Sequence, residues 1–399
     1  MAEMNTRSTT AVEEPKEDTY REWQLAQKIP RVTGLYVPDV NELEVAPWEQ
    51  KGGLGAFINL EGTADVTDAY VCEIPPGGQL NPQRHLYEEV IYILKGVGAT
   101  HIRQQTGKKQ SFEWHAGSLF SIPLNASYQH FNGSGSQPVR YIAFTSAPFM
   151  MNIFHNLDFI FENDFAFIDR FDSGDENYFT QNATRIGFNK FVMNFIPDIS
   201  SFVFGDPKRL YGGIKGSTKS GFMELEMAKQ VLGPHISTYP VGAHWPAHYH
   251  GPGAQLLMFE GEGYDLLWPF DRYDERIKID LKPGSLWAPA DRWFHQHFNT
   301  GHVERRQLAV KPWGGTRRSI MTQADKPGLR RETTRRGGTL IEFADEDPEI
   351  HKEFEAELAK VGTACAMGDV HPFCTQRSSG SVPPPQWPLG GHFPVGTGG

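Results

Sequence analysis

The sequence predicts a mainly β protein built from two tandem copies of one domain. Its 399 residues are enough for two domains with their own cores. Two gapless blocks repeat along the chain: residues 76–96 align with 241–261, and residues 117–132 align with 284–299. Short apolar runs that end at glycine, such as 254–261, are typical of strands that end in turns. The repeat offset of about 165 residues therefore separates two related β domains.

The second copy carries histidines in a pattern typical of a metal site. Gly242 is followed by His248 and His250, and His295 comes further along the chain. Side chains two residues apart in a strand project from the same face, so His248 and His250 can hold one ion. His295, arriving from another strand, would complete a face of three imidazoles, which suits first-row divalent metals. The sequence predicts these three histidines as metal ligands.

The first copy has lost most of these ligands. Gln83, His85 and Tyr128 occupy the positions of the three histidines, and Glu89 is aligned with Ala254. Only His85 and Glu89 are good ligands for a metal ion. A weak or empty site is therefore expected in the first copy.

The motifs Gly-x5-His-x-His and, further on, Gly-Ser-Leu with His-x3-Asn resemble the two signatures of the cupin superfamily. Two copies in one chain resemble a bicupin, over roughly residues 55–150 and 215–315. The resemblance implies two tandem double-stranded β-helix (jelly-roll) barrels. Most metal cupins place a glutamate four residues after the second histidine, where this chain has Ala254. The neighbouring Gln255 would face the opposite side of its strand unless a bulge intervenes.

A three-histidine site without a carboxylate is similar to that of gentisate- or salicylate-type ring-cleaving bicupins, and of the cupin thiol and diketone dioxygenases. The resemblance therefore implies an Fe(II) enzyme with O2 as co-substrate, which cleaves a C–C bond of a small chelating substrate such as an aromatic hydroxy-acid or phenolic. Mn(II) and Zn(II) are the alternative metals. Two other functions stay open: a redox-neutral metal cupin, such as a decarboxylase or isomerase, and a non-catalytic bicupin that binds a ligand.

Three further residues are candidates for catalysis. His297 follows His295 by two residues and so shares its face, where it could act as an acid or base or bond a ligand oxygen. His130 stands at the equivalent place in the first copy, so a structural role for His297 is the alternative. His244 precedes the first motif, near the expected rim. Arg292 could clamp a substrate carboxylate through two hydrogen bonds.

The flanking segments complete the predicted organisation. A phenylalanine-rich segment between the copies is expected to pack across both barrels, or to form a subunit interface or lid. Acidic residues and an early proline begin an amphipathic helix near the C-terminus. The predicted order is a disordered tail (1–18), an N-terminal barrel with a degenerate metal site (19–150), a linker (151–214), a C-terminal barrel with the metal site (215–315), an extension (316–377) with a helix at about 346–361, and a Pro/Gly-rich tail (378–399).

The composition narrows the class of function. A net charge of −10 and a pI near 5.8 give no basic surface for nucleic acid or for a membrane. The N-terminal residues contain no apolar segment of the kind found in signal peptides, so a cytoplasmic enzyme with a small-molecule substrate is expected. Bicupins commonly associate, which favours a homo-oligomer. The cysteines Cys72, Cys365 and Cys374 are too few and too scattered to predict a disulfide framework or a zinc site.

Overall fold

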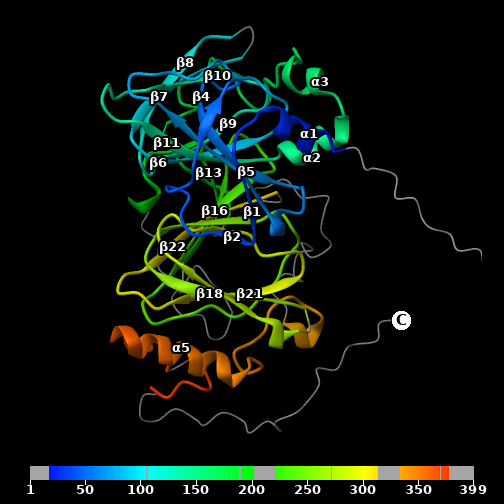
Figure 1. Ribbon diagram of the computed structural model, residues 1–399. Coiled ribbons are helices and arrows are strands. Elements are labelled where there is room, and N and C mark those ends of the chain that lie inside the picture. Colours follow the sequence, from blue (N-terminus) through cyan, green and yellow to red (C-terminus); the bar gives the residue numbers. More distant parts are fainter. Residues whose placement is uncertain are drawn as a thin grey trace, which may run out of the picture.

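The computed structural model describes residues 18–104, 107–180, 182–187, 190–201, 221–270, 272–312, 333–368 and 370–376. The predicted N-terminal tail, apart from Asp18, and the predicted tail 378–399 lie outside these residues. Figure 1 shows two β units stacked on one another, with helix α5 (Pro348–Val361) against the far side of the second unit.

The first unit is formed by a large and a small sheet that face each other. The large sheet has the order β1-β4-β5-β11-β6-β9-β14, with β3 paired to β4, and the small sheet has the order β10-β7-β8. The strands are β1 (Arg31–Gly34), β3 (Ala46–Trp48), β4 (Gly53–Leu60), β5 (Asp68–Ile74), β6 (Glu89–Lys95), β7 (Val97–Arg103), β8 (Gln110–His115), β9 (Leu119–Ile122), β10 (Ser127–Asn132), β11 (Val139–Thr145) and β14 (Phe195–Ile196).

The second unit repeats this arrangement. Its large sheet has the order β12-β13-β15-β16-β22-β17-β20-β2, and its small sheet the order β19-β18-β21. The strands are β2 (Tyr36–Val37), β12 (Thr184–Arg185), β13 (Lys190–Val192), β15 (Gly221–Glu226), β16 (Gly233–Tyr239), β17 (Gln255–Glu260), β18 (Gly263–Pro269), β19 (Ile277–Leu281), β20 (Leu286–Trp287), β21 (Trp293–Asn299) and β22 (Arg305–Lys311). The path β4-β5-β11-β6-β9 thus recurs as β15-β16-β22-β17-β20, and the predicted mainly β fold of two barrels is confirmed.

Two short segments connect the barrels by exchange of edge strands. β1 pairs in parallel with β4 of the first barrel, but β2, just after it, pairs with β20 of the second barrel. In the same way β13 pairs in parallel with β15, and the following β14 pairs with β9 of the first barrel. The segment predicted as a linker therefore contributes strands to both sheets, and it cannot be separated from either barrel.

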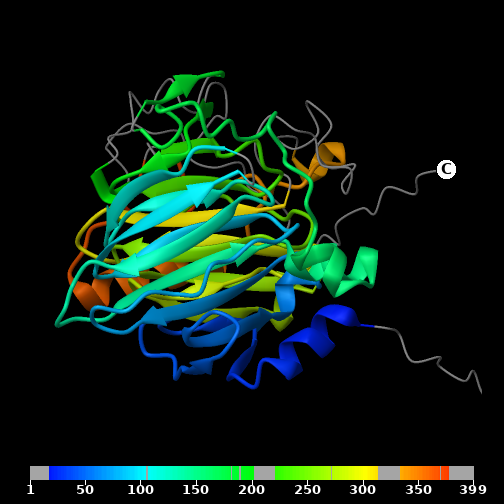
Figure 2. The same cartoon turned by 90° about the horizontal axis from the view of Figure 1, so that it is seen from above.

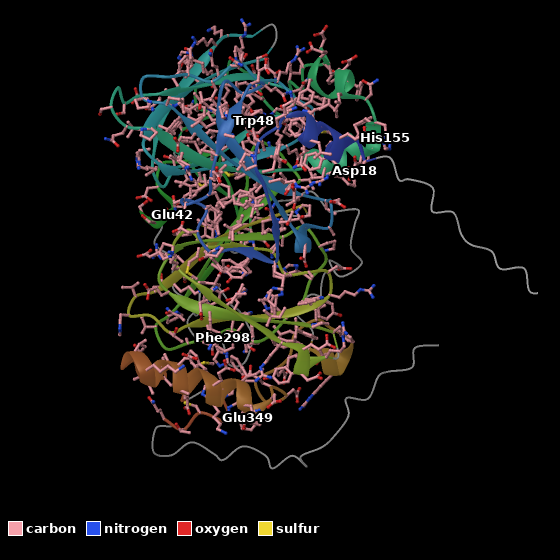
Figure 3. All side chains as sticks on the ribbon, in the orientation of Figure 1. Asp18, Glu42, Trp48, His155, Phe298 and Glu349 are labelled. Carbon is pink, nitrogen blue, oxygen red and sulfur yellow. The ribbon has the colours of Figure 1, made fainter. Side chains whose placement is uncertain are left out.

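The two large sheets pack face to face through a shared apolar core. Seen from above, the strands of the two barrels overlap (Figure 2). β6 is buried along most of its length because one face lines the interior of the first barrel and the other meets the second barrel. Strands buried on both faces read as continuous apolar runs, as in Val90–Leu94. β7 of the small sheet alternates instead between exposed and buried residues. Trp48 lies inside the first barrel, in its aromatic core (Figure 3).

Helices cover the outer surfaces. α1 (Thr19–Ala26), α2 (Ala147–Phe154) and α3 (Leu157–Phe161) lie beside the first barrel (Figure 1). Of the linker aromatics, Phe171 and Phe179 are buried, whereas Phe159 and Phe165 are exposed. The short 3-10 turns are η1 (Glu61–Thr63), η2 (Ile199–Ser201), η3 (Tyr273–Glu275) and η5 (Thr334–Arg336). Among the described residues, no helix has the length and apolar character needed to cross a membrane.

The helix predicted at about 346–361 is confirmed as α5. The Asp347 side chain accepts a hydrogen bond from the Glu349 backbone N–H at 2.9 Å, and Pro348 occupies the first turn. Gly362, at φ 71°, ends the helix in the left-handed conformation that glycine adopts readily. Phe354 packs against Phe298 of β21, with ring centroids 5.6 Å apart. The helix is thus fixed on the small sheet of the second barrel.

Replacing Asp347 by alanine is expected to lower the free energy of unfolding by about 1 kcal/mol, because the orphan amides of the first turn lose their side-chain acceptor. Thermal denaturation would measure the change. Lys352→Ala is the matched control, since Lys352 is exposed on the same helix and its ion pair with Glu349 lies at the surface. An equal loss in both variants would contradict the capping role.

Candidate metal centre

The second barrel brings its histidines together through strand pairing. His295 and His297 lie on β21, two residues apart and on one face. The loop before β17 pairs with this strand: the His248 N–H donates to the His295 carbonyl at 3.0 Å, and the His295 N–H donates back at 2.8 Å. The bridge places the side chain of His248 beside that of His295.

Among the described residues, four histidines gather at this point. The His295 ring centroid lies 4.3 Å from that of His248 and 4.6 Å from that of His250. The rings of His248 and His250 are 6.2 Å apart. The His297 ring lies 5.5 Å from His295 and 5.8 Å from His248. His248, His295 and His297 offer nitrogens that all lie within 4.8 Å of one another, which is close enough to share an ion.

The hydrogen bonds of these histidines define which nitrogen carries the proton. Because a carbonyl or carboxylate oxygen can only accept, each Nδ1 is the donor and each Nε2 holds the lone pair, which is the arrangement found around protein-bound metals. The Nδ1 acceptors are Pro246 O for His248 at 3.1 Å, Gly251 O for His250 at 2.9 Å, Trp293 O for His295 at 3.2 Å, and Asp265 Oδ2 for His297 at 2.7 Å.

Electrostatics also favour neutral imidazoles. Burial, and then the neighbouring histidines, lower the pKa of His295 well below its ordinary value. Burial also lowers the pKa of His297, although the Asp265 carboxylate opposes this. Neutral histidines are the form that donates a lone pair to a metal. The residues present therefore fit a first-row divalent ion.

A buried ion pair stands behind His297. Arg305 contacts Asp265 at 2.7 Å between Nη2 and Oδ1, and both side chains are fully buried. Burial acts to raise the pKa of Asp265, but Arg305 and His297 outweigh it and hold the pKa below its usual range. The carboxylate is thus charged at neutral pH, and it fixes the ring of His297 through the short Nδ1 bond.

His244 lies away from this group, which corrects its expected place near the substrate. Its backbone pairs with Phe298, whose side chain alternates with that of His297 and points to the outer face of β21. His244 is fully buried beneath α5, with Nε2 3.0 Å from His351 Nδ1. The physical reason is strand alternation: the residue opposite Phe298 faces the helix and not the barrel interior.

Arg292 and Gln255 have different surroundings. Arg292 is exposed in the turn before β21, at φ 58°, and its contact with substrate stays a prediction. Gln255 is buried and donates to Thr67 Oγ1 of the first barrel at 3.2 Å. Along the same strand, Leu257 faces the first barrel and Leu256 lines the second. Gln255 is two residues from Leu257 and so shares its face. Gln255 therefore points away from the histidines.

The equivalent place in the first barrel holds a lysine. Lys51 is buried, with Nζ 2.6 Å from the Tyr70 hydroxyl and 4.0 Å from Glu89 Oε1. Tyr70 and Tyr128 both donate to Glu89, Tyr128 at 2.8 Å. His85 Nε2 lies 3.0 Å from the Tyr128 hydroxyl. An ammonium group and tyrosine hydroxyls thus surround the carboxylate that a metal would contact.

Three of these residues were not found from the sequence. Asp265 was detectable, because it is a lone charge in the apolar strand β18 (Gly263–Pro269). Lys51 and Arg305 precede or follow the repeated motifs, and nothing in their immediate sequence marks them as buried. Gln83, which replaces the first histidine, donates from its side-chain amide to the Gln50 backbone carbonyl at 3.1 Å.

One protein family and several solved structures resemble parts of this chain. The cupin domain family (Cupin_2) matches residues 70–145. No curated protein sequence matches the chain. Solved structures that resemble it include an oxalate decarboxylase (12% identity, 74% of this chain and 82% of that chain, TM-score 0.45). Another is the oxalate decarboxylase of Bacillus subtilis, studied for its Mn(II) centres (12% identity, 74% and 82% coverage, TM-score 0.44). Likeness at this level does not identify the reaction.

The first barrel, which contains residues 70–145, is therefore a cupin domain. Because the second barrel repeats the strand order of the first, the chain contains two barrels of one architecture.

Proposed function

We propose that the second barrel holds one divalent first-row metal on His248, His250, His295 and His297, and that it catalyses a redox-neutral reaction, such as decarboxylation or isomerisation, of a small chelating carboxylate. The bound ion would supply Lewis acidity. The observation that carries the proposal is the fourth histidine: His297 has a nitrogen within 4.8 Å of those of His248 and His295, and Asp265 fixes its tautomer.

The number of donors favours the redox-neutral reaction over an oxygenase. Octahedral divalent ions such as Mn(II) accept about six donors. Four imidazole ligands would leave two positions on such an ion, and a bidentate substrate would fill both. No third position would then remain for dioxygen beside the substrate.

The charge of the donor set favours an anionic substrate. Four neutral imidazoles leave the double positive charge of the ion uncompensated in a buried site, where Coulomb attraction is stronger than in water. Asp265 does not offset it, because Arg305 balances that carboxylate at 2.7 Å. A carboxylate or hydroxy-carboxylate would supply the missing negative charge.

A ring-cleaving dioxygenase is the second candidate. It is favoured by Ala254 in place of a carboxylate ligand and by the position of His250, which is not in the group of nitrogens within 4.8 Å. If only three histidines bound the ion, three positions would stay open, enough for a chelating substrate and dioxygen together.

We also infer that the first barrel works without a metal. The Lys51 ammonium, 4.0 Å from Glu89, already supplies the positive charge that a cation would bring. This barrel then serves as a scaffold that supports β14 and the interface with the second barrel.

Nitric oxide binding to the Fe(II)-loaded protein tests the number of open positions, because nitric oxide occupies a dioxygen position and gives an electron paramagnetic resonance signal. We expect the signal in the absence of a chelator and its loss at saturating oxalate, used as a bidentate probe. A ternary complex of oxalate, nitric oxide and iron would overturn the four-histidine centre and favour the dioxygenase.

Turnover then identifies the reaction. Protein loaded with Mn(II) or Fe(II) is incubated, once anaerobically and once in air, with small oxo- and hydroxy-carboxylates and with dihydroxybenzoates. Conversion without oxygen supports the redox-neutral proposal. Conversion that requires and consumes oxygen contradicts it, and failure of the folded protein to bind any of these metals favours a non-catalytic binding protein.

A further inference from the structure

A second group of metal-binding side chains lies on the opposite side of β21, under α5. His351 and Glu355 are one helical turn apart on α5, and Cys365 and Cys374 follow the helix. The two sulfurs are 3.5 Å apart although the cysteines are separated by nine residues. No sequence pattern pairs these cysteines, which are too scattered along the chain to predict a zinc site, yet the structure brings two of them together.

Three of the six distances between the four donors are close to those of a tetrahedral zinc site. With ordinary zinc bond lengths, tetrahedral geometry requires about 3.8 Å between two sulfurs, about 3.6 Å between sulfur and nitrogen, and about 3.4 Å between nitrogen and oxygen. The observed distances are 3.5 Å for the two sulfurs, 3.8 Å for Cys365 Sγ to His351 Nε2, and 3.6 Å for His351 Nε2 to Glu355 Oε1. All four donor atoms lie within 4.8 Å of one another.

Surrounding hydrogen bonds orient the donors. His244 Nε2 lies 3.0 Å from His351 Nδ1, which leaves His351 Nε2 to face the sulfurs. Thr375 donates to Glu355 Oε1 from its backbone N–H at 2.7 Å and from its hydroxyl at 2.9 Å. Such outer contacts are typical of metal ligands, because they fix the direction of each lone pair.

We propose that His351, Glu355, Cys365 and Cys374 bind one structural zinc ion. Thiolates and imidazole are the donors that zinc prefers, and four protein ligands close the site to substrate. His351 and the two cysteines are buried, so the ion is shielded from bulk water. The two thiolates and the carboxylate supply the negative charge that offsets the dication.

The adjacent residues Glu346 and His371 are not part of this ligand set. His371 Nε2 contacts Glu346 Oε1 at 2.9 Å, an ordinary hydrogen-bond distance. Glu346 also accepts from Gln296 Nε2 at 2.5 Å. These contacts form a network that positions His244, and through it His351.

The zinc ion would join α5 to the segment that follows it, and both belong to the C-terminal extension. The extension also pairs with the loop that carries the barrel histidines, since the Ile341 N–H donates to Ala247 O at 2.8 Å and the Tyr249 N–H donates to Thr339 O at 3.0 Å. Leu340 forms a β-bridge with His248. Fixing the extension therefore also fixes the backbone on either side of His248.

Cobalt substitution tests the site in the full-length protein. Protein purified under reducing conditions is analysed for zinc, and the zinc is then exchanged for Co(II). We expect zinc bound to the wild type and, after exchange, an intense near-ultraviolet absorption from thiolate-to-cobalt charge transfer. Barrel histidines cannot give this absorption, so the result is independent of the metal centre proposed for the second barrel.

The variants assign the ligands. Cys365→Ser and Cys374→Ser are each expected to lose at least half of the charge-transfer absorption, while Cys72→Ala, a change at a buried cysteine of the first barrel, keeps it in full. Absorption at the full wild-type intensity in both serine variants would overturn the ligand set. If the wild-type protein binds no zinc and shows no such absorption with cobalt, the site itself is overturned. This holds whether the thiols are reduced or joined as a disulfide. The measurement uses only the wild type, so it does not depend on the folding of any variant.

Discussion

Replacing Lys51 by methionine is expected to destabilise the first barrel by about 3–5 kcal/mol, because removal of one partner leaves the other as an uncompensated buried charge. Lys51 is 2% exposed and Glu89 is fully buried, 4.0 Å away. Methionine retains much of the packing volume, so the charge is the principal change. Urea-induced unfolding followed by tryptophan fluorescence would measure the loss.

The pH dependence of this loss has a definite sign. Burial acts to raise the pKa of Glu89, but Lys51 and His85 outweigh it and hold the pKa well below the ordinary value of 4.5. A lowered pKa stabilises the fold above the pKa of the unfolded chain, and this stabilisation is lost as the pH falls. Without Lys51 the carboxyl would be protonated more readily. The difference between wild type and Lys51→Met should therefore shrink as the pH falls below 4.5.

A double-mutant cycle separates charge from packing. Glu89→Gln removes the charge and keeps the shape, so the double variant Lys51→Met/Glu89→Gln should be more stable than Lys51→Met alone. If the changes in the free energy of unfolding caused by the two substitutions simply add in the double variant, Lys51 acts through packing. The proposal that the lysine charge takes the place of a metal ion would then fail.

Replacing His295 by alanine is expected to weaken Mn(II) binding by more than about 100-fold. Mutation of a residue that only hydrogen-bonds to a metal ligand typically weakens binding by about 10–100-fold, and His295 is a proposed ligand itself. His295 is the central imidazole, with ring centroids of His248 and His250 at 4.3 and 4.6 Å. Its removal leaves no donor between the two. Calorimetric titration of the metal-free protein with Mn(II) measures the affinity, and Mn(II) is chosen because it avoids the thiolate group beneath α5.

His85→Ala is the matched control for this experiment. His85 stands at the equivalent motif of the first barrel, where it contacts the Tyr128 hydroxyl at 3.0 Å. This variant should bind Mn(II) as the wild type does. Equal loss of binding in both variants would mean that the ion is held in the first barrel or shared by both, against the proposed assignment.

Much of the fold could be predicted because it depends on local patterns. The gapless repeat, the apolar runs and the turn glycines predicted two β domains, and the capped amphipathic run predicted a helix at about 346–361, found at Pro348–Val361. Strand periodicity also put His295 and His297 on one face, and Gln255 on the opposite face from Ala254. These inferences need only the two-residue period of a strand and the capping chemistry of a helix.

The exchange of edge strands could not be predicted in this way. β2 and β14 are two residues long, too short for a periodic pattern. Their partners β20 and β9 belong to the other barrel, and only the packing of the two large sheets brings them within reach. The domain boundaries drawn from the sequence stay a prediction. β2 lies within the segment predicted as the first barrel but pairs with the second barrel, and β14 lies within the predicted linker but pairs with the first barrel.

The sequence by itself determined the two β domains, the C-terminal helix and the histidines that the second motif supplies, because each is encoded by residues close together in the chain. Only the tertiary structure decided which buried groups meet: Lys51 beside Glu89, Asp265 and Arg305 behind His297, and His244 under α5. It also brought Cys365 and Cys374 together beside His351. The physical reason is that a buried charge or thiol is defined by partners from distant strands and helices, and these come together only when the barrels and the extension have packed.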